Sequence, residues 1–173
     1  IRALDSVNLQ LGASADFTMQ HNGTKTLLQN FTGNLEIIQN VDDGDIFFKS
    51  DDGSGGVATY MQIDGSNSRV IFPNNVKAAF GSSSRLVIVH DGTDATIRET
   101  HGDLQIVNTA DDKDIIFQSD DGSGGTATYM TIDGSATKTV FSKPIEVGAD
   151  GASHDVKFFG DTSGKYMQWD ASA

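Results

Sequence analysis

The sequence predicts an all-β protein on the basis of three observations. Ile and Val together number 24 against eight Leu, and 15 Thr add further side chains branched at Cβ, which fit a pleated strand better than a helix. The acidic residues are 21 Asp and only three Glu, and Asp favours turns whereas Glu favours helix interiors. Apolar and polar residues alternate in short runs, with Gly- and Asp-rich breaks about every ten residues. We therefore expect short strands and turns, and no helix of even three turns.

The strands of the first half follow from this alternation. Phe17, Met19 and His21 are expected on one face of a strand. The dipeptide Asn22-Gly23 then predicts a two-residue type I′ turn, which needs positive φ at both central residues. Further strands are expected at Leu27–Gln29, Leu35–Gln39, Ile46–Ser50, Val57–Ile63 and Arg69–Phe72. The breaks between them fall at residues 32–34, 42–44, 53–56 and 64–66.

An internal repeat organises the chain. Residues 12–79 align without gaps on residues 81–148, and 29 of the 68 aligned pairs are identical, which identifies a structural repeat. The densest identity is Ser50–Gly56 against Ser119–Gly125. A partial third copy begins near Gly151, where Val156–Asp161 aligns with Leu86–Asp91 and Tyr166–Asp170 with Tyr60–Asp64. The predicted divisions are a lead-in at 1–11, β-repeats at 12–79 and 80–149, and a partial third repeat at 150–173.

Charge and composition exclude several classes of function. The net charge of −12 argues against binding to nucleic acid and to anionic membrane surfaces, because both need clustered Lys and Arg. The longest apolar runs have only a few residues, far below the ~20 that cross a bilayer, so membrane insertion is not expected. Without Cys the chain has no disulfide, thiolate metal site or Cys nucleophile. We expect no cofactor.

Each repeat has too little apolar material to stand alone. Ordering the backbone costs about 1–2 kcal/mol per residue, and small cores barely offset that cost. Repeated units without disulfides usually stack on neighbours or associate, which also covers exposed strand edges. We therefore expect an elongated assembly of identical chains. The residues expected to pack between chains are Ile46, Phe48, Tyr60, Met61, Ile63, Ile115, Phe117, Tyr129, Met130 and Ile132.

Three stretches of the sequence carry a family resemblance: Phe80–Thr93 followed by Gly102–Ile106, then Asp114–Gly125, then Val156–Met167. They resemble phrases of tail-fibre and related virion structural proteins of marine tailed bacteriophages, and the resemblance covers nearly the whole chain from residue 12. It implies a rod-like, repetitive, homotrimeric fibre on the outside of a virion, either intertwined or β-prism-like. The first repeat departs from the usual Asp-Leu-x-Ile before its histidine, because it reads Asp16–Met19 there.

The acidic, Gly-rich loops are the most conspicuous candidates for metal binding. Asp51, Asp52, Asp120 and Asp121 offer carboxylate oxygens of the kind that calcium prefers. Their spacing matches neither an EF-hand loop nor a calcium β-roll. We favour the alternative, in which Asp begins a turn and Gly supplies its positive φ.

Two further candidate sites have simpler alternatives. His21 and His90 occupy equivalent positions, and around a threefold axis three such imidazoles would hold a metal or an anion; we favour local bonding at the end of a strand. Glycoside hydrolysis needs a pair of carboxylates across a cleft. Glu36 and Glu99 occupy non-equivalent positions and the conspicuous Asp residues recur in both repeats, as scaffold residues do, so we expect no enzyme.

The leading functional hypothesis is a structural segment of a bacteriophage tail fibre or similar virion appendage, which holds or presents a host-receptor-binding tip. Its expected partners are identical chains in a homotrimer and other tail proteins of the virion, and its expected location is the extracellular particle, after synthesis in the host cytoplasm. The second hypothesis is a module that binds host-surface glycan or another virion protein through its loops. The third is a tailspike-type polysaccharide depolymerase.

Overall fold

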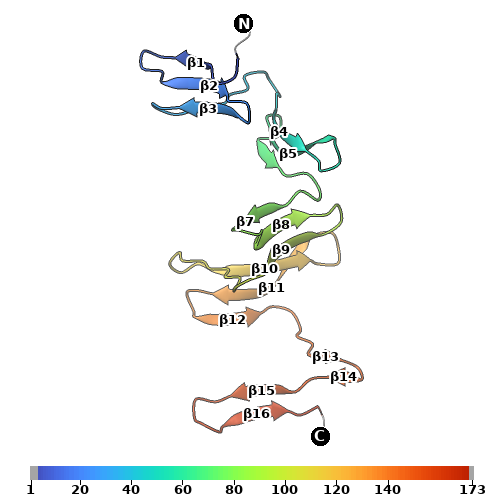
Figure 1. Cartoon of the computed structure of the whole chain (residues 1–173). Coiled ribbons are helices and arrows are strands. Elements are labelled where there is room, and N and C mark those ends of the chain that lie inside the picture. Colours follow the sequence, from blue (N-terminus) through green and yellow to red (C-terminus); the bar gives the residue numbers. More distant parts are fainter. Residues whose placement is uncertain (1–3, 172–173) are drawn as a thin grey trace. The chain divides into compact units, whose positions relative to one another are not determined.

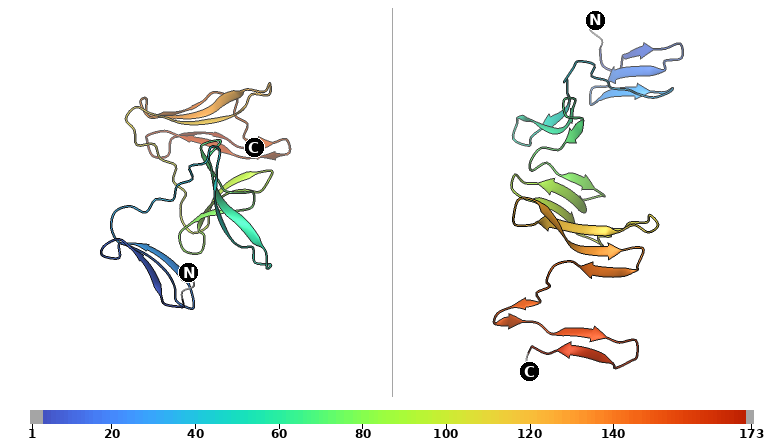
Figure 2. Two further views of the ribbon diagram at one scale, coloured as in Figure 1. Left: turned by 90° about the horizontal axis from the view of Figure 1, so that it is seen from above. Right: turned by 180° about the vertical axis from the view of Figure 1, so that it is seen from behind.

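A computed structural model describes residues 4–171, and within this range the chain forms strands, turns and irregular segments but no helix (Figure 1). The sixteen strands of this range form six small sheets, in which every pairing is antiparallel and joins strands adjacent in the sequence. Figure 2 shows the same succession of hairpins from two further directions. The prediction of an all-β protein is confirmed. The described residues include no helix with the length and apolarity needed to cross a bilayer.

The chain divides into two units, residues 1–102 and residues 103–173. The first unit contains three three-stranded sheets. Their strands are β1 (Asn8–Leu11), β2 (Phe17–His21) and β3 (Thr26–Asn30), then β4 (Ile46–Asp51), β5 (Val57–Asp64) and β6 (Arg69–Ile71), then β7 (Ala78–Phe80), β8 (Leu86–His90) and β9 (Ala95–Glu99). β1 lies within the segment expected as a lead-in, and β7 crosses the expected boundary between residues 79 and 80.

The second unit contains one three-stranded sheet and two hairpins. Their strands are β10 (Ile115–Asp120), β11 (Thr126–Asp133) and β12 (Lys138–Phe141), then β13 (Gly148–Ala149) and β14 (Ala152–Ser153), then β15 (Val156–Phe159) and β16 (Tyr166–Trp169). Sheet β10–β12 has the same pairing as sheet β4–β6, as the repeat predicts.

The turn between β2 and β3 differs from the predicted type I′ turn. The strand register leaves a four-residue loop at 22–25. Gly23 has a φ of 88°, but Asn22 is not among the residues with positive φ. Instead, Oδ1 of Asn22 accepts hydrogen bonds from the backbone N–H groups of Thr24 and Lys25, both at 3.1 Å. An Asn side chain that bonds the backbone just ahead of it mimics a turn, so one left-handed residue is enough.

Sheets β4–β6 and β10–β12 contain the same β-bulge. The pairing of β4 with β5 shifts at Tyr60, which has no partner across the ladder. The Tyr60 hydroxyl donates a hydrogen bond to the backbone carbonyl of Asp51 at 2.8 Å, and Tyr129 does the same to Asp120 at 2.9 Å. A bulge redirects a side chain, and here it ties the tyrosine to the strand end that precedes the Gly-rich loop.

Three hairpins are closed by an aspartate that precedes the first strand. Its Oδ1 accepts a hydrogen bond from a backbone N–H one or two residues beyond the second strand. The pairs are Asp45 with Gly65 at 3.0 Å, Asp114 with Gly134 at 3.0 Å and Asp155 with Ala171 at 2.9 Å. A carboxylate acceptor strengthens such a bond relative to a neutral one, so the same contact fixes the open end of each hairpin.

These bonds correct the alignment of the partial third copy. The sequence places Val156–Asp161 on Leu86–Asp91, which is β8. In the structure, β15 pairs Val156 with Trp169 and Phe158 with Met167, as β4 pairs Ile46 with Ile63 and Phe48 with Met61. Hairpin β15–β16 therefore corresponds to hairpin β4–β5, without the bulge and with a shorter loop.

Candidate interaction surface

In sheets β4–β6 and β10–β12 most of the apolar side chains lie on one face, while Phe47 with Ile71 and Ile116 with Val140 lie on the other. Ladder partners share a face, as do alternate residues along a strand. We call these two surfaces the apolar faces. They consist of Ile46, Phe48, Met61, Ile63 and Val70 in the first unit, and of Ile115, Phe117, Met130, Ile132 and Phe141 in the second. Eight of the ten residues predicted to pack between chains thus lie on these faces, four in each unit, while Tyr60 and Tyr129 lie at the bulges.

The opposite face of sheet β4–β6 carries polar groups that are paired within the chain. Gln62 and Asp64 alternate with the apolar residues of β5 and therefore point to this face. Nε2 of Gln62 donates to Oδ2 of Asp45 at 2.9 Å, and Nε of Arg69 donates to Oδ2 of Asp64 at 3.0 Å. The polar groups of this face, which they share with Phe47 and Ile71, are thus paired within the chain.

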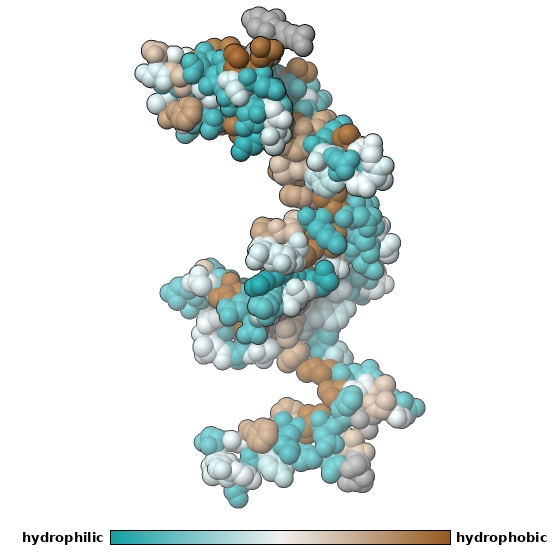
Figure 3. Space-filling view, in the orientation of Figure 1, coloured by the Kyte–Doolittle hydropathy of each residue, from teal (hydrophilic) through white to brown (hydrophobic). Residues whose placement is uncertain are grey.

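Neither apolar face is covered within its own unit. Phe48 and Phe117 are 41% and 40% exposed, and Ile63 and Ile132 are 40% and 43% exposed. Among the described residues the one buried apolar side chain is Val87. Within the described part of each unit, strands approach to within 8 Å between Cα atoms only inside the same sheet. Figure 3 shows hydrophobic residues at the surface in both units, where a closed core would hide them.

Sheets β1–β3 and β7–β9 have the same two-sided character. Leu9, Met19 and Leu28 are partners across the first sheet, and all three are exposed. Gln10, Thr18 and Gln29 are partners on its other face. In the third sheet the exposed pair Ile88 and Ile97 shares a face with Phe80 and Leu86. All four three-stranded sheets therefore present an apolar side without a cover.

The single chain also exposes far more area than folded chains of its size. Its solvent-accessible surface is 14125 Å². Two separate compact bodies with the sizes of residues 1–102 and 103–173 would expose about 10,000 Å² together. The surplus of about 4,000 Å² is area that a folded protein normally buries.

Two segments add to this uncovered apolar surface. Residues 34–40 and 103–109, which we call the linking segments, contain neither a turn nor a bend, and every residue in them is exposed. Their apolar residues occupy equivalent positions of the two repeats: Leu35, Ile37 and Ile38, and Leu104, Ile106 and Val107. The prediction of a strand at Leu35–Gln39 is wrong for the single chain, because no strand of the described residues pairs with it. Sequence reasoning missed these residues as packing candidates, although their recurrence at matched positions was the signal.

The acidic loops use their carboxylates to close turns. Oδ2 of Asp51 accepts from the N–H of Gly53 at 2.9 Å. Oδ1 of Asp52 accepts from the hydroxyl and the N–H of Ser54, both at 2.8 Å, and from the N–H of Gly56 at 3.0 Å. The bond from the Ser54 hydroxyl is the main cause that holds the pKa of Asp52 below its usual value.

The second repeat builds the same loop with Asp120 and Asp121. Between residues 4 and 171 no three His, Asp or Glu side chains come together in a way that would hold a metal ion.

The two histidines make local contacts at the ends of their strands. Nδ1 of His21 lies 3.2 Å from the Thr26 hydroxyl. Nδ1 of His90 accepts a hydrogen bond from the N–H of Gly92 at 3.0 Å. Both contacts form at a hairpin loop, which is the local role that sequence reasoning favoured.

The two glutamates considered as a catalytic pair lie in different elements. Glu36 is in the first linking segment, whereas Glu99 ends β9. Oε1 of Glu99 accepts from the backbone N–H groups of His101 and Thr100 at 2.8 and 3.0 Å, and the His101 bond is the main cause that lowers the pKa of Glu99. Glu99 therefore closes a turn.

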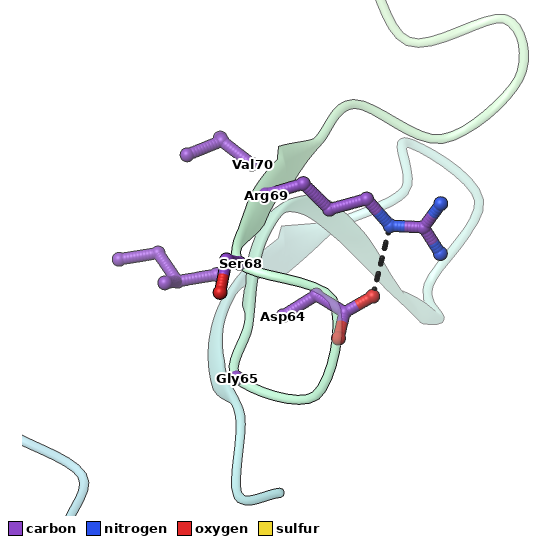
Figure 4. A pocket seen from close by; sticks show the side chains of 6 residues that line it. Asp64, Gly65, Ser68, Arg69 and Val70 are labelled. Atoms are coloured by element: carbon purple, nitrogen blue, oxygen red, sulfur yellow. Dashed lines mark hydrogen bonds and ion pairs between the residues drawn. The ribbon is translucent and has the colours of Figure 1, made fainter.

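A shallow pocket at the turn between β5 and β6 has Asp64, the best-bonded carboxylate of the first unit, among its lining residues (Figure 4). Asp64 is only 5% exposed. Its oxygens accept from the Ser66 hydroxyl at 2.7 Å, the Asn67 N–H at 3.1 Å and Nε of Arg69 at 3.0 Å. The Ser66 bond is the main cause that places the pKa of Asp64 well below its usual value. The carboxylate is thus engaged in organising the turn after β5.

Comparison with protein-family models, with curated proteins and with solved structures finds no match to this chain.

Proposed function

We propose that this chain is a structural segment of a bacteriophage tail fibre or a similar virion appendage, formed by association of three identical copies. The observation that carries the proposal is the set of uncovered apolar sheet faces that recurs through both repeats. Burial of apolar area is the dominant favourable contribution to folding and association, and neither unit covers its own apolar faces. Copies that meet through them would gain the core that one chain lacks.

The area available supports an obligate assembly. A standard interface buries about 800 Å² on each partner, and obligate interfaces bury about 1,000–2,500 Å² or more on each partner. The surplus of about 4,000 Å² per chain is enough for two interfaces of the obligate class. The number three and the virion location rest on the resemblance of Phe80–Thr93 and the two later stretches to tail-fibre phrases.

The assembly is tested by light scattering of the purified chain at micromolar concentration. We expect a mass of three times 18.4 kDa, stable over a tenfold dilution. A folded chain that scatters as a single copy would contradict the proposal.

The virion location is tested by labelling phage particles with antibodies raised against this chain and imaging them by negative-stain microscopy. We expect the label along the tail appendages. Label on the capsid alone would contradict the assignment to a fibre.

A further inference from the structure

We propose that the two linking segments pair as added β-strands with sheet edges of a second copy of this chain. This inference rests on the proposed self-association and names the backbone contact that would accompany the apolar packing. The segments are residues 34–40 and 103–109, and neither contains Gly or Pro.

The backbone of the linking segments lacks partners within the described chain. None of the backbone N–H and C=O groups of residues 34–40 or 103–109 makes a hydrogen bond to another backbone group between residues 4 and 171. The turns that follow the segments are closed, by Gly44 to Val41 at 2.9 Å and by Lys113 to Ala110 at 3.3 Å. The lack of partners is therefore confined to the straight stretches.

The side chains of the same segments require burial. Ile37 and Ile106 are 65% and 61% exposed, and their apolar neighbours are exposed to a similar extent. Burying these side chains also removes the adjoining backbone from water, and a buried backbone group without a hydrogen bond is costly. The segments can meet both needs at once only by pairing with another strand.

A second copy of the chain offers strand edges with which the linking segments can pair. Every described sheet has two free edges, because each is a short meander whose outer strands pair on one side only. An exposed edge is a template for an added strand. The two segments occupy equivalent positions of the two repeats. The same kind of contact between copies can therefore supply backbone partners to both segments. Pairing between copies also buries part of the surplus accessible area of the chain. A single interface of standard size would leave that part exposed.

The test measures hydrogen exchange by mass spectrometry on the full chain under conditions where light scattering reports the assembled mass. We expect amides of both linking segments to exchange at least ~100-fold more slowly than those of the exposed Gly53–Gly56 loop, as paired strands do. Exchange as fast as that of the loop in an assembled chain would overturn the inference while leaving the proposed assembly intact. A single-copy mass would overturn both.

Proline variants give an independent measure. Proline removes an N–H and is not tolerated inside a paired strand, so I37P and I106P are expected to reduce the assembled fraction by at least ~10-fold. The matched controls are D42P and D111P. They lie at the second position of the turns Val41–Gly44 and Ala110–Lys113, a position that proline favours. Full assembly of I37P and I106P would overturn the inference, as would equal loss in the controls.

Discussion

The two repeats have the same hairpin frame but differ at the turn that ends the long strand. The tyrosine-to-backbone bond measures 2.8 Å in the first repeat and 2.9 Å in the second, and the aspartate-to-backbone bond measures 3.0 Å in both. At the turn, Arg69 lies 3.0 Å from a nearly buried Asp64, whereas Lys138 lies 4.0 Å from Asp133, whose side chain is 22% exposed. The backbone contacts are retained, and so are the bonds from the Ser66 and Ser135 hydroxyls to the aspartate at 2.7 and 2.9 Å, whereas the ion pair is longer in the second repeat. The ion pair is therefore an addition to the shared hairpin geometry.

Substitutions on the apolar faces have the largest expected effect on assembly. They test whether both repeats contribute to it. Aspartate in place of Phe48 or Phe117 would place a charge without a partner in the proposed interface, which is strongly unfavourable. We expect each of F48D and F117D to raise the dissociation constant at least ~100-fold, measured by light scattering over a dilution series. Gln118→Asp, at the next position and on the opposite face, is the control and should assemble normally. If one phenylalanine variant assembles normally, the repeats are not equivalent.

Substitutions of the glycines at the open end of the hairpins have the next largest expected effect. A Cβ on Gly65 would collide with the backbone carbonyl oxygen of Gly44, and a Cβ on Gly134 with that of Lys113. Neither obstacle is a flexible side chain, so we expect G65A and G134A each to lower the free energy of unfolding by about 1–3 kcal/mol in urea titrations. Gly102→Ala, where a Cβ meets open space, is the control. A difference above about 1 kcal/mol between the two variants would contradict a shared frame.

The dependence of stability on pH in acid gives the smallest expected effect. It distinguishes the turn after β5 from the turn after β11. The pKa values of Asp64 and Asp133 are both lowered, chiefly by the Ser66 hydroxyl and the Ala136 N–H respectively. A lowered pKa in the folded state stabilises the fold above the unfolded value of about 4, and this contribution is lost as the pH falls through the folded value. We expect D64N to flatten the dependence of the thermal midpoint on pH below about 5 more than D133N does. Equal flattening would show that Arg69 adds nothing.

The features predicted correctly from the sequence are those set by neighbours along the chain. The alternation of apolar and polar residues predicted the strand at Ile46–Ser50, and the Gly- and Asp-rich breaks predicted the loop before Val57. The same local reasoning gave eight of the ten residues of the apolar faces. Val70 and Phe141 were missed because they follow a turn and join the face only through the register of a third strand.

The features predicted incorrectly depend on distant partners. Residues Leu35–Gln39 have the composition of a strand, but a strand also needs a neighbour, and its presence cannot be read from the segment itself. The sequence comparison placed Val156–Asp161 on Leu86–Asp91. Its true counterpart is revealed by Asp155, whose bond to Ala171 spans the hairpin. The predicted type I′ turn failed because the Asn22 side chain, not a second positive φ, closes the loop.

The near identity of the two apolar faces creates a problem of alignment between copies. A copy displaced by one full repeat would bring Ile115 and Phe117 to the place of Ile46 and Phe48, and chains staggered in this way leave open ends to which further copies add without limit. Where the first face has Val70, the second has Thr139, a hydroxyl that resists burial without a hydrogen bond. A few positions at which the two faces differ in this way would therefore keep the copies in register and the assembly finite.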